Sequence, residues 1–259
     1  MRGSVPRLVS LDFTGVMAKC NVAVAYRRAA ADAIGGVAAA RLEKVDNATL
    51  VESFGLAFRT QLKQSVTFGG VKDDAQRRWW DAVIDETWSR SGVVLDAAEA
   101  ARVREQTFHR FATAEFWSVF DDIHPLLAAA AARGVPVAVV SNFDGRLPGI
   151  LDALGLADGL AAVVFASQYE REAKPNRVLF DDMLAASGAA HLPREDVWHV
   201  GDSFAADVCG AAQAGLQPVW LQRGGIRADD VVADHGGALE TVRIASLASI
   251  TARLAASPP

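Results

Sequence analysis

The most informative segment of the chain reads Val200-Gly201-Asp202-Ser203-Phe204-Ala205-Ala206-Asp207. It places Asp202 and Asp207 directly after the apolar residues 197–200, which predict a short strand, and it opens a helix-like segment. Open α/β sheets bind their ligands at the carboxyl ends of such strands. Hard cations such as Mg²⁺ prefer carboxylate and carbonyl oxygens, so the two aspartates are candidate ligands at a sheet edge.

The residues around this segment alternate between strand-like and helix-like patterns. Short β-prone runs occupy residues 7–12, 136–140, 162–165, 197–200 and 218–221. Helical patterns accompany the last four runs, near residues 126–133, 147–154, 177–186 and 207–214. Strands that alternate with helices form a parallel sheet covered on both faces, so the predicted fold class is α/β.

A long helical stretch, residues 17–120, interrupts this alternation after the first strand. Its apolar residues recur at helical spacing with charges between them, as in Leu50 and Phe54. The simplest organisation is an α/β core, residues 1–16 and 121–259, that holds an all-helical insert, residues 17–120.

Composition places the chain among ordinary globular proteins. Of its 259 residues, 51% are hydrophobic and 22% are charged. The net charge of −5 argues against nucleic-acid and anionic-membrane partners, which need an excess of Lys and Arg. Cys20 and Cys209 give no disulfide framework, and the first apolar run, residues 8–11, is too short for a signal peptide or a spanning helix. We therefore expect a cytoplasmic protein with no nucleic-acid or membrane partner.

Four chemically distinctive elements fall at the predicted strand ends and helix starts. In chain order they are Asp12 with Gly15, Ser141 with Asn142, Lys174 before Pro175, and the pair Asp202 and Asp207. Each has an ordinary explanation on its own, because Asp and Ser stabilise turns and Lys-Pro is common on surfaces. The complete set, in this order, favours a single site at the carboxyl edge of the sheet.

This ordered set resembles the haloacid dehalogenase-like hydrolase superfamily over essentially the whole chain. Asp12 matches its nucleophile, Ser141 its second motif, Lys174 its third motif, and Asp202 with Asp207 its fourth motif. The resemblance implies a Rossmann-like core in which the helical insert is a cap that selects substrate.

Shorter segments narrow the resemblance further. Residues 141–144, Trp79-Trp80 and residues 207–215 are similar to the branch called haloacid dehalogenase-like hydrolase domain-containing protein three. That branch often lacks the second aspartate that typical phosphatases of the superfamily carry two residues after the nucleophile.

The resemblance also implies a Mg²⁺-dependent phosphatase of a small phosphorylated metabolite. Asp12 would attack the phosphoryl group and form an aspartyl-phosphate. Ser141 and Lys174 would bind the phosphoryl oxygens, and Asn142 would either assist Ser141 there or stabilise a turn. The direct Mg²⁺ ligands would be Asp12, Asp202 and the backbone carbonyl of Thr14, with Asp207 either supporting them or binding the ion itself.

Two residues depart from the superfamily pattern in the first motif. Thr14 replaces the second aspartate, which typically serves as general acid and base, and Val16 replaces a threonine. A hydroxyl does not readily protonate a leaving alkoxide near neutral pH, and general acid–base assistance is worth about 10²–10⁴ in rate. We therefore expect slow turnover. The alternatives are a catalytically impaired protein that binds a ligand or partner and, disfavoured by the paired acidic motif, a dehalogenase.

Two alternative assignments of the catalytic residues stay open. In the first, Ser10 occupies the nucleophile position and Asp12 the acid position, but Gly15 and the apolar run up to Leu11 disfavour this alignment of the motif. Asp144 is a candidate substitute for the missing acid, although an aspartate followed by glycine is more typical of a turn.

Several further residues have two interpretations each. His199 is either a base or a hydrogen-bonded structural histidine, and its place within a strand favours the structural role. The segment Arg223-Gly224-Gly225 is either a phosphate-facing loop or a turn. The tryptophans either line a substrate pocket or form the core of the insert, and helical spacing favours the core for Trp79, Trp80, Trp88 and Trp117.

Overall fold

The computed structural model describes residues 5–224 and 241–256 of the chain. Within them, six strands form one sheet in the order β5-β4-β1-β6-β7-β8, and every neighbouring pair is parallel. The strands are β1 (Leu8–Leu11), β4 (Val137–Ser141), β5 (Leu160–Phe165), β6 (Val197–Gly201), β7 (Gln217–Leu221) and β8 (Val242–Ile244). The prediction of an α/β fold with a parallel sheet is confirmed.

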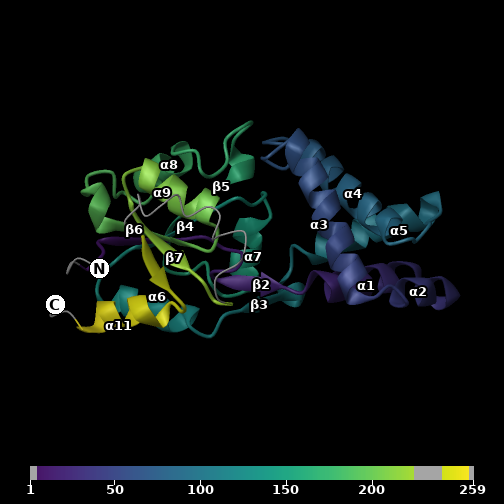
Figure 1. Cartoon of the computed structure of the whole chain (residues 1–259), viewed down its shortest axis with the longest axis horizontal. Helices are drawn as coiled ribbons and strands as arrows, with labels where there is room; N and C mark the ends of the chain where they lie inside the picture. The colour runs from purple at the N-terminus through teal and green to yellow at the C-terminus, as the bar shows by residue number, and fades with distance from the viewer. Residues whose placement is uncertain (1–4, 225–240, 257–259) are drawn as a thin grey trace.

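Helices cover both faces of this sheet (Figure 1). One face packs against α6 (Ile123–Ala132), α7 (Leu147–Ala153) and α11 (Ala248–Ala256), and the other against α8 (Val178–Ala186) and α9 (Cys209–Gln213). Successive side chains of a strand point to opposite faces, so Val9 and Leu11 join the first layer of core and Leu8 joins the second. Burial on both faces explains why the strands read as apolar runs rather than as alternating patterns.

Five helices form a separate region beside the sheet (Figure 1). They are α1 (Val22–Ile34), α2 (Gly36–Glu43), α3 (Asn47–Gln64), α4 (Asp73–Arg90) and α5 (Ala97–Arg110). Side chains cap several of their N-termini, including Asp96, whose carboxylate accepts from the backbone N–H of Glu99 in a capping box. The helices bury their own apolar clusters, one of which is centred on Tyr26 and Trp88.

The helical region does not fill the whole stretch of residues 17–120. Two three-residue strands, β2 (Ala18–Cys20) and β3 (Trp117–Val119), pair antiparallel where the chain leaves and re-enters the core. The expectation of helix directly after the first strand was therefore wrong at both ends of the stretch. Three residues are too few to display a strand period, so this pair could not be predicted from the residue pattern.

Smaller elements complete the described residues. Single-turn helices occupy Ala114–Phe116, Ala166–Gln168 and Arg194–Asp196, and a wide π-helical turn, Phe204–Val208, leads into α9. Among residues 5–224 and 241–256, no helix is both long enough and apolar enough to cross a membrane.

Candidate active site

Three neighbouring strands of the sheet bring the site together. Because β4, β1 and β6 are adjacent and parallel, the loops that follow them meet at one edge. Asp12 comes directly after β1, Ser141 is the last residue of β4, and Asp202 follows β6. The backbone N–H of Asp12 donates to the carbonyl of Val200 at 2.9 Å, which extends the β1–β6 pairing up to the site.

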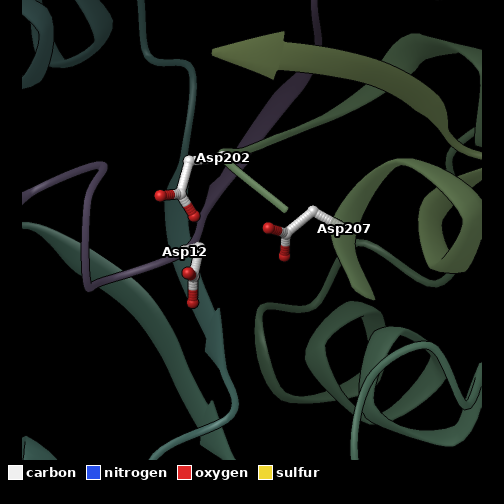
Figure 2. A group of neighbouring side chains, drawn as sticks. All are labelled: Asp12, Asp202 and Asp207. Carbon is white, nitrogen blue, oxygen red and sulfur yellow. The ribbon is translucent and has the colours of Figure 1, made fainter. Parts of the chain in front are cut away.

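Three carboxylates converge at this edge, as Figure 2 shows. One oxygen each from Asp12, Asp202 and Asp207 lies within 4.8 Å of the others. Asp12 is 9% exposed and Asp207 is 1% exposed, so these two charges are largely shielded from water, whereas Asp202 is partly exposed. Like charges this close repel unless cations offset them.

Two glycines make this approach possible. A Cβ at Gly15, whose φ is +83°, would lie 2.3 Å from Oδ2 of Asp202. A Cβ at Gly201 would lie 2.0 Å from Cγ of Asp207. The sequence predicted Gly15 as a turn residue. The structure adds that both positions must lack a side chain for the carboxylates to fit.

Lys174 supplies a positive charge inside the cluster. Its Nζ lies 2.9 Å from Oδ1 of Asp12 and 2.5 Å from Oδ1 of Asp207, and it donates to the carbonyl of Val140 at 2.7 Å. Burial by itself lowers the Lys174 pKa, but the charges of Asp12 and Asp207 outweigh it and hold that pKa above its ordinary value. The ammonium therefore stays charged and offsets part of the repulsion.

Asp207 is held from several sides. Its Oδ2 accepts from the backbone N–H of Ser203 at 2.9 Å, and its Oδ1 lies 3.2 Å from Nε2 of His199. Burial alone raises the Asp207 pKa, but the charge of Lys174 and the bond from His199 hold the pKa well below its usual range. This ionised carboxylate supports the cluster and orients Lys174.

His199 links the cluster to the sheet. Burial is the main reason that its pKa lies below the ordinary value, so the ring is neutral. A carboxylate only accepts, so Nε2–H donates to Asp207, and Nδ1 accepts the Ser10 hydroxyl at 2.9 Å. This arrangement fits the structural role favoured from the sequence. It also disfavours Ser10 as nucleophile, because Ser10 is fully buried.

The second motif holds the third in place. The side chain of Asn142 donates through Nδ2 to the carbonyl of Lys174 at 3.0 Å and accepts the backbone N–H of Lys174 through Oδ1 at 2.7 Å. Asn142 thus fixes the backbone that carries the lysine, a contact across 32 residues that local reasoning did not find. Ser141 beside it is 2% exposed.

Thr14 lies in the loop that follows Asp12. Its backbone is bridged to Ala18, and the N–H of Gly15 donates to the carbonyl of Ala18 at 2.8 Å. The indole Nε1 of Trp220 donates to the carbonyl of Asp202 at 3.2 Å and fixes the opposite loop. The role of the Thr14 carbonyl as a cation ligand stays a prediction.

An apolar cavity of about 360 Å³ adjoins the carboxylate cluster and extends into the helical region. Thr14 and Asn142 form part of its wall, and most of the remaining wall is aromatic. Trp80 and Trp117 line this cavity and also pack, partly buried, against core clusters, so each of them takes part in both the wall and the core. Trp79 and Trp88 are 5% and 1% exposed and belong to the core, as expected.

Asp144 forms a buried ion pair at the wall of the cavity. Arg146 reaches its two carboxylate oxygens at 2.9 Å and 2.6 Å, and the indole of Trp80 donates to it at 2.8 Å. The backbone N–H of Arg146 also donates to Asp144 at 2.9 Å, which is the turn contact expected for this residue. These donors occupy the carboxylate and disfavour it as a substitute acid.

Arg223 is a structural residue in the described part of the chain. Its guanidinium pairs with Asp122 at 2.7 Å and donates to the carbonyl of Val16 at 2.9 Å. The alternative of a phosphate-facing loop is therefore disfavoured for Arg223, while Gly225 lies outside the described residues.

The chain is similar in sequence to a known protein family and to individual known proteins. A family model described as haloacid dehalogenase-like hydrolase matches residues 6–215. Haloacid dehalogenase-like hydrolase domain-containing protein 3 from Homo sapiens is 32% identical over 191 residues, which are 74% of this chain and 74% of that protein. A phosphoserine phosphatase from Thermus thermophilus is 31% identical over 150 residues, 54% of this chain and 57% of that protein.

Solved structures share the architecture. The crystal structure of a dehalogenase with an intermediate complex has a TM-score of 0.67 and 19% identity, with 98% of this chain and 99% of that one covered. The crystal structure of a HAD phosphatase from Thermococcus onnurineus has a TM-score of 0.60 and 18% identity, with 95% and 97% covered. At these identities the likeness is one of fold.

Proposed function

The chain belongs to the haloacid dehalogenase-like hydrolase family, and from that premise we propose that it is a slow Mg²⁺-dependent phosphatase of a small phosphorylated metabolite, with Asp12 as nucleophile. The observation that carries the proposal is the cluster of three carboxylates within 4.8 Å, with Lys174 in contact with two of them. The similarity to a phosphoserine phosphatase supports phosphoryl chemistry.

The donor set fits Mg²⁺. Lys174 offsets one of three negative charges, and the two that remain suit a divalent cation. Carboxylate and carbonyl oxygens are the protein ligands that this ion prefers. We assign Asp12, Asp202 and the backbone carbonyl of Thr14 as ligands, with Asp207 in support. When bound, Mg²⁺ reduces the repulsion between an attacking carboxylate and the phosphoryl oxygens.

The reaction then proceeds in two steps. A carboxylate oxygen of Asp12 attacks phosphorus, the bond from phosphorus to the ester oxygen breaks, and that oxygen leaves with the electron pair and takes a proton from water. Water next attacks the aspartyl-phosphate, which releases phosphate and regenerates Asp12. Lys174 and the Ser141 hydroxyl bind the phosphoryl oxygens, and Asn142 keeps Lys174 in position.

Thr14 supports one alternative, a catalytically impaired protein that binds a phosphorylated ligand or a partner. Without a carboxylic acid at this position, the leaving oxygen has no strong proton donor from the first motif. The carboxylate cluster disfavours the dehalogenase alternative, because attack on carbon requires no cation.

The test is Mg²⁺-dependent release of phosphate from 4-nitrophenyl phosphate, whose leaving group needs little protonation. We expect wild-type turnover that stops with EDTA and is absent from Asp12→Asn. Asp152→Asn, which removes an exposed carboxylate from α7, is the charge-matched control and should be active. Intact-protein mass spectrometry of quenched wild type should detect one added phosphoryl group.

Two results would count against this proposal. Equal rates for wild type and Asp12→Asn would remove Asp12 from the reaction. Inactivity of the wild type on every phosphoester, together with activity in Thr14→Asp, would favour the impaired binding protein.

A further inference from the structure

The apolar cavity beside the carboxylate cluster indicates which class of substrate the site can bind. It measures about 360 Å³, at the lower end of the range for small-molecule sites. Thr14, two residues after Asp12, and Asn142, next to Ser141, form part of its wall, so the organic group of a phosphate ester held at Asp12 would have this space beside it. Seven aromatic side chains dominate the wall contributed by the helical region: Tyr26, Phe54, Phe58, Phe68, Trp80, Phe108 and Phe111.

The only charged side chains among the described lining residues are Asp144 and Arg146, and they satisfy each other. Nε and Nη2 of Arg146 donate to Asp144, and Nη1 donates to the carbonyl of Phe108 at 3.0 Å. The guanidinium also lies 4.7 Å from the ring centre of Trp80 and 4.4 Å from that of Phe108. Its edges and faces are therefore occupied, so neither charge is available to a charged organic group.

Two hydroxyls of residues in the wall, those of Tyr26 and Thr107, have no hydrogen-bond partner within the described residues. Both oxygen atoms are buried, so neither presents a surface to a ligand in the cavity. The surface that the wall offers to an organic group is therefore mostly apolar.

We propose that the phosphorylated ligand of this protein carries a neutral, largely apolar organic group, such as an arylalkyl chain. This inference rests on the proposed function for the placement of the phosphate. A sugar would leave several hydroxyls without partners in this cavity, and an ammonium or carboxylate would lose its hydration without gaining a counter-charge. An aromatic ring instead exchanges water for apolar contact.

The test compares four primary alkyl phosphates, so that the leaving oxygen is similar throughout: ethyl, 2-phenylethyl, 2-aminoethyl and 2-carboxyethyl phosphate. Burial of a phenyl ring is worth enough to raise kcat/KM by about 10- to 100-fold over ethyl phosphate. We expect 2-phenylethyl phosphate to be preferred by that factor and both charged esters to fall below ethyl phosphate.

Substitutions on α3 test whether the cavity wall causes the preference for 2-phenylethyl phosphate. Phe58→Leu and Phe58→Ala should reduce the preference for 2-phenylethyl over ethyl phosphate stepwise, the first guarding against misfolding of the second. Val51→Ala is the matched control, because Val51 lies on the same helix but is 51% exposed and outside the cavity wall.

A binding experiment distinguishes failure of this inference from failure of the proposed function. The probe is 3-phenylpropylphosphonate, a non-hydrolysable analogue of 2-phenylethyl phosphate, measured by calorimetry with Mg²⁺ present. Binding that weakens in Phe58→Leu supports the inference even if no ester is hydrolysed, in which case only the proposed function fails. Preference for 2-aminoethyl or 2-carboxyethyl phosphate overturns the inference and leaves the function standing. Absence of both turnover and binding overturns both.

Discussion

The strand-end site and the apolar cavity adjoin each other but are built in opposite ways. The site consists of charged side chains near the carboxyl ends of the strands: Asp12 and Asp202 directly follow β1 and β6, and Asp207 lies in the helical turn after β6. The cavity consists mostly of aromatic side chains on helices of the inserted region, with its one ion pair neutralised internally. The segments after the strands thus position the charged groups, and the helical region forms most of the cavity wall.

This difference predicts how the two regions respond to substitution. In the site, Lys174 contacts two carboxylates that lie near a third, so removal of one group leaves others buried without a counter-charge. In the cavity, the loss of one ring leaves the remaining wall in place. Substitutions in the site should therefore affect the reaction more, and those in the cavity wall should change selectivity.

The largest expected effect is that of Lys174→Met. Loss of the charge-bearing donor should lower kcat/KM on the order of 10³-fold. The buried carboxylates that remain should also lower the free energy of unfolding by about 3–5 kcal/mol without Mg²⁺. Phosphate release and urea denaturation measure the two effects.

A divalent cation should partly replace the lost ammonium in this variant. Addition of Mg²⁺ should therefore raise Tm more in Lys174→Met than in wild type. Lys44→Met, at the exposed end of α2, is the control and should alter neither quantity. An equal rise of Tm in Lys174→Met and wild type would contradict the charge balance inferred for the cluster.

The second prediction concerns the ion pair at the cavity wall. Arg146→Met leaves Asp144, which is 1% exposed, without its cation, and should lower the free energy of unfolding by about 3 kcal/mol. The double variant Asp144→Asn/Arg146→Met removes both charges and should be more stable than Arg146→Met alone. Urea denaturation of wild type, Asp144→Asn, Arg146→Met and the double variant gives the coupling energy. A double variant no more stable than Arg146→Met would mean that packing, and not charge, explains the loss.

The third prediction addresses the missing acid. Thr14→Asp places a carboxyl group in the loop after β1, two residues from Asp12, and should raise kcat for alkyl phosphates by about 10²-fold, the lower end for general acid–base assistance. The gain should be smaller for 4-nitrophenyl phosphate, whose leaving group needs little protonation. Thr14→Asn, of similar shape but without an acidic proton, is the control. Equal gains for both esters would point to a change in binding rather than to proton transfer.

The same contrast explains what the sequence revealed. Parallel strand ends follow from short apolar runs, and polar residues directly after them, such as Asp12 and Asp202, must meet at one edge. The α/β class, the helical region and the identity of the clustered carboxylates were therefore predictable. The roles of these residues in catalysis remain predictions.

Other features depend on contacts between distant parts of the chain. The clamp of Asn142 on Lys174 spans 32 residues, and no local pattern encodes it. The inward direction of Trp80 depends on how helices pack against the loop after β4, whereas helical spacing gives only the face on which it lies. The strands β2 and β3 are too short to carry a period.

The smallest effect concerns Asp122, which supports the loop after β1 from outside both regions. Its carboxylate pairs with Arg223, accepts from the Ser246 hydroxyl at 2.7 Å and accepts from the N–H of Leu247 at 2.9 Å. Arg223 in turn holds the carbonyl of Val16. Asp122→Asn should lower the free energy of unfolding by about 2 kcal/mol and lower kcat for every ester alike, because the cavity is unchanged.

The pH dependence of this loss gives a separate check. Although burial favours the protonated form, Arg223 and the two other donors hold the Asp122 pKa below its ordinary value of 3.8. The contribution of Asp122 is therefore complete at neutral pH and disappears as the pH falls through the lowered pKa. Urea denaturation should show the gap between wild type and Asp122→Asn closing below pH 3.8, whereas Asp121→Asn, an exposed neighbour, should match wild type throughout. A gap that persists in acid would assign the loss to hydrogen-bond geometry instead of charge. A changed ester preference in Asp122→Asn would mean that the strand-end site and the cavity are not independent.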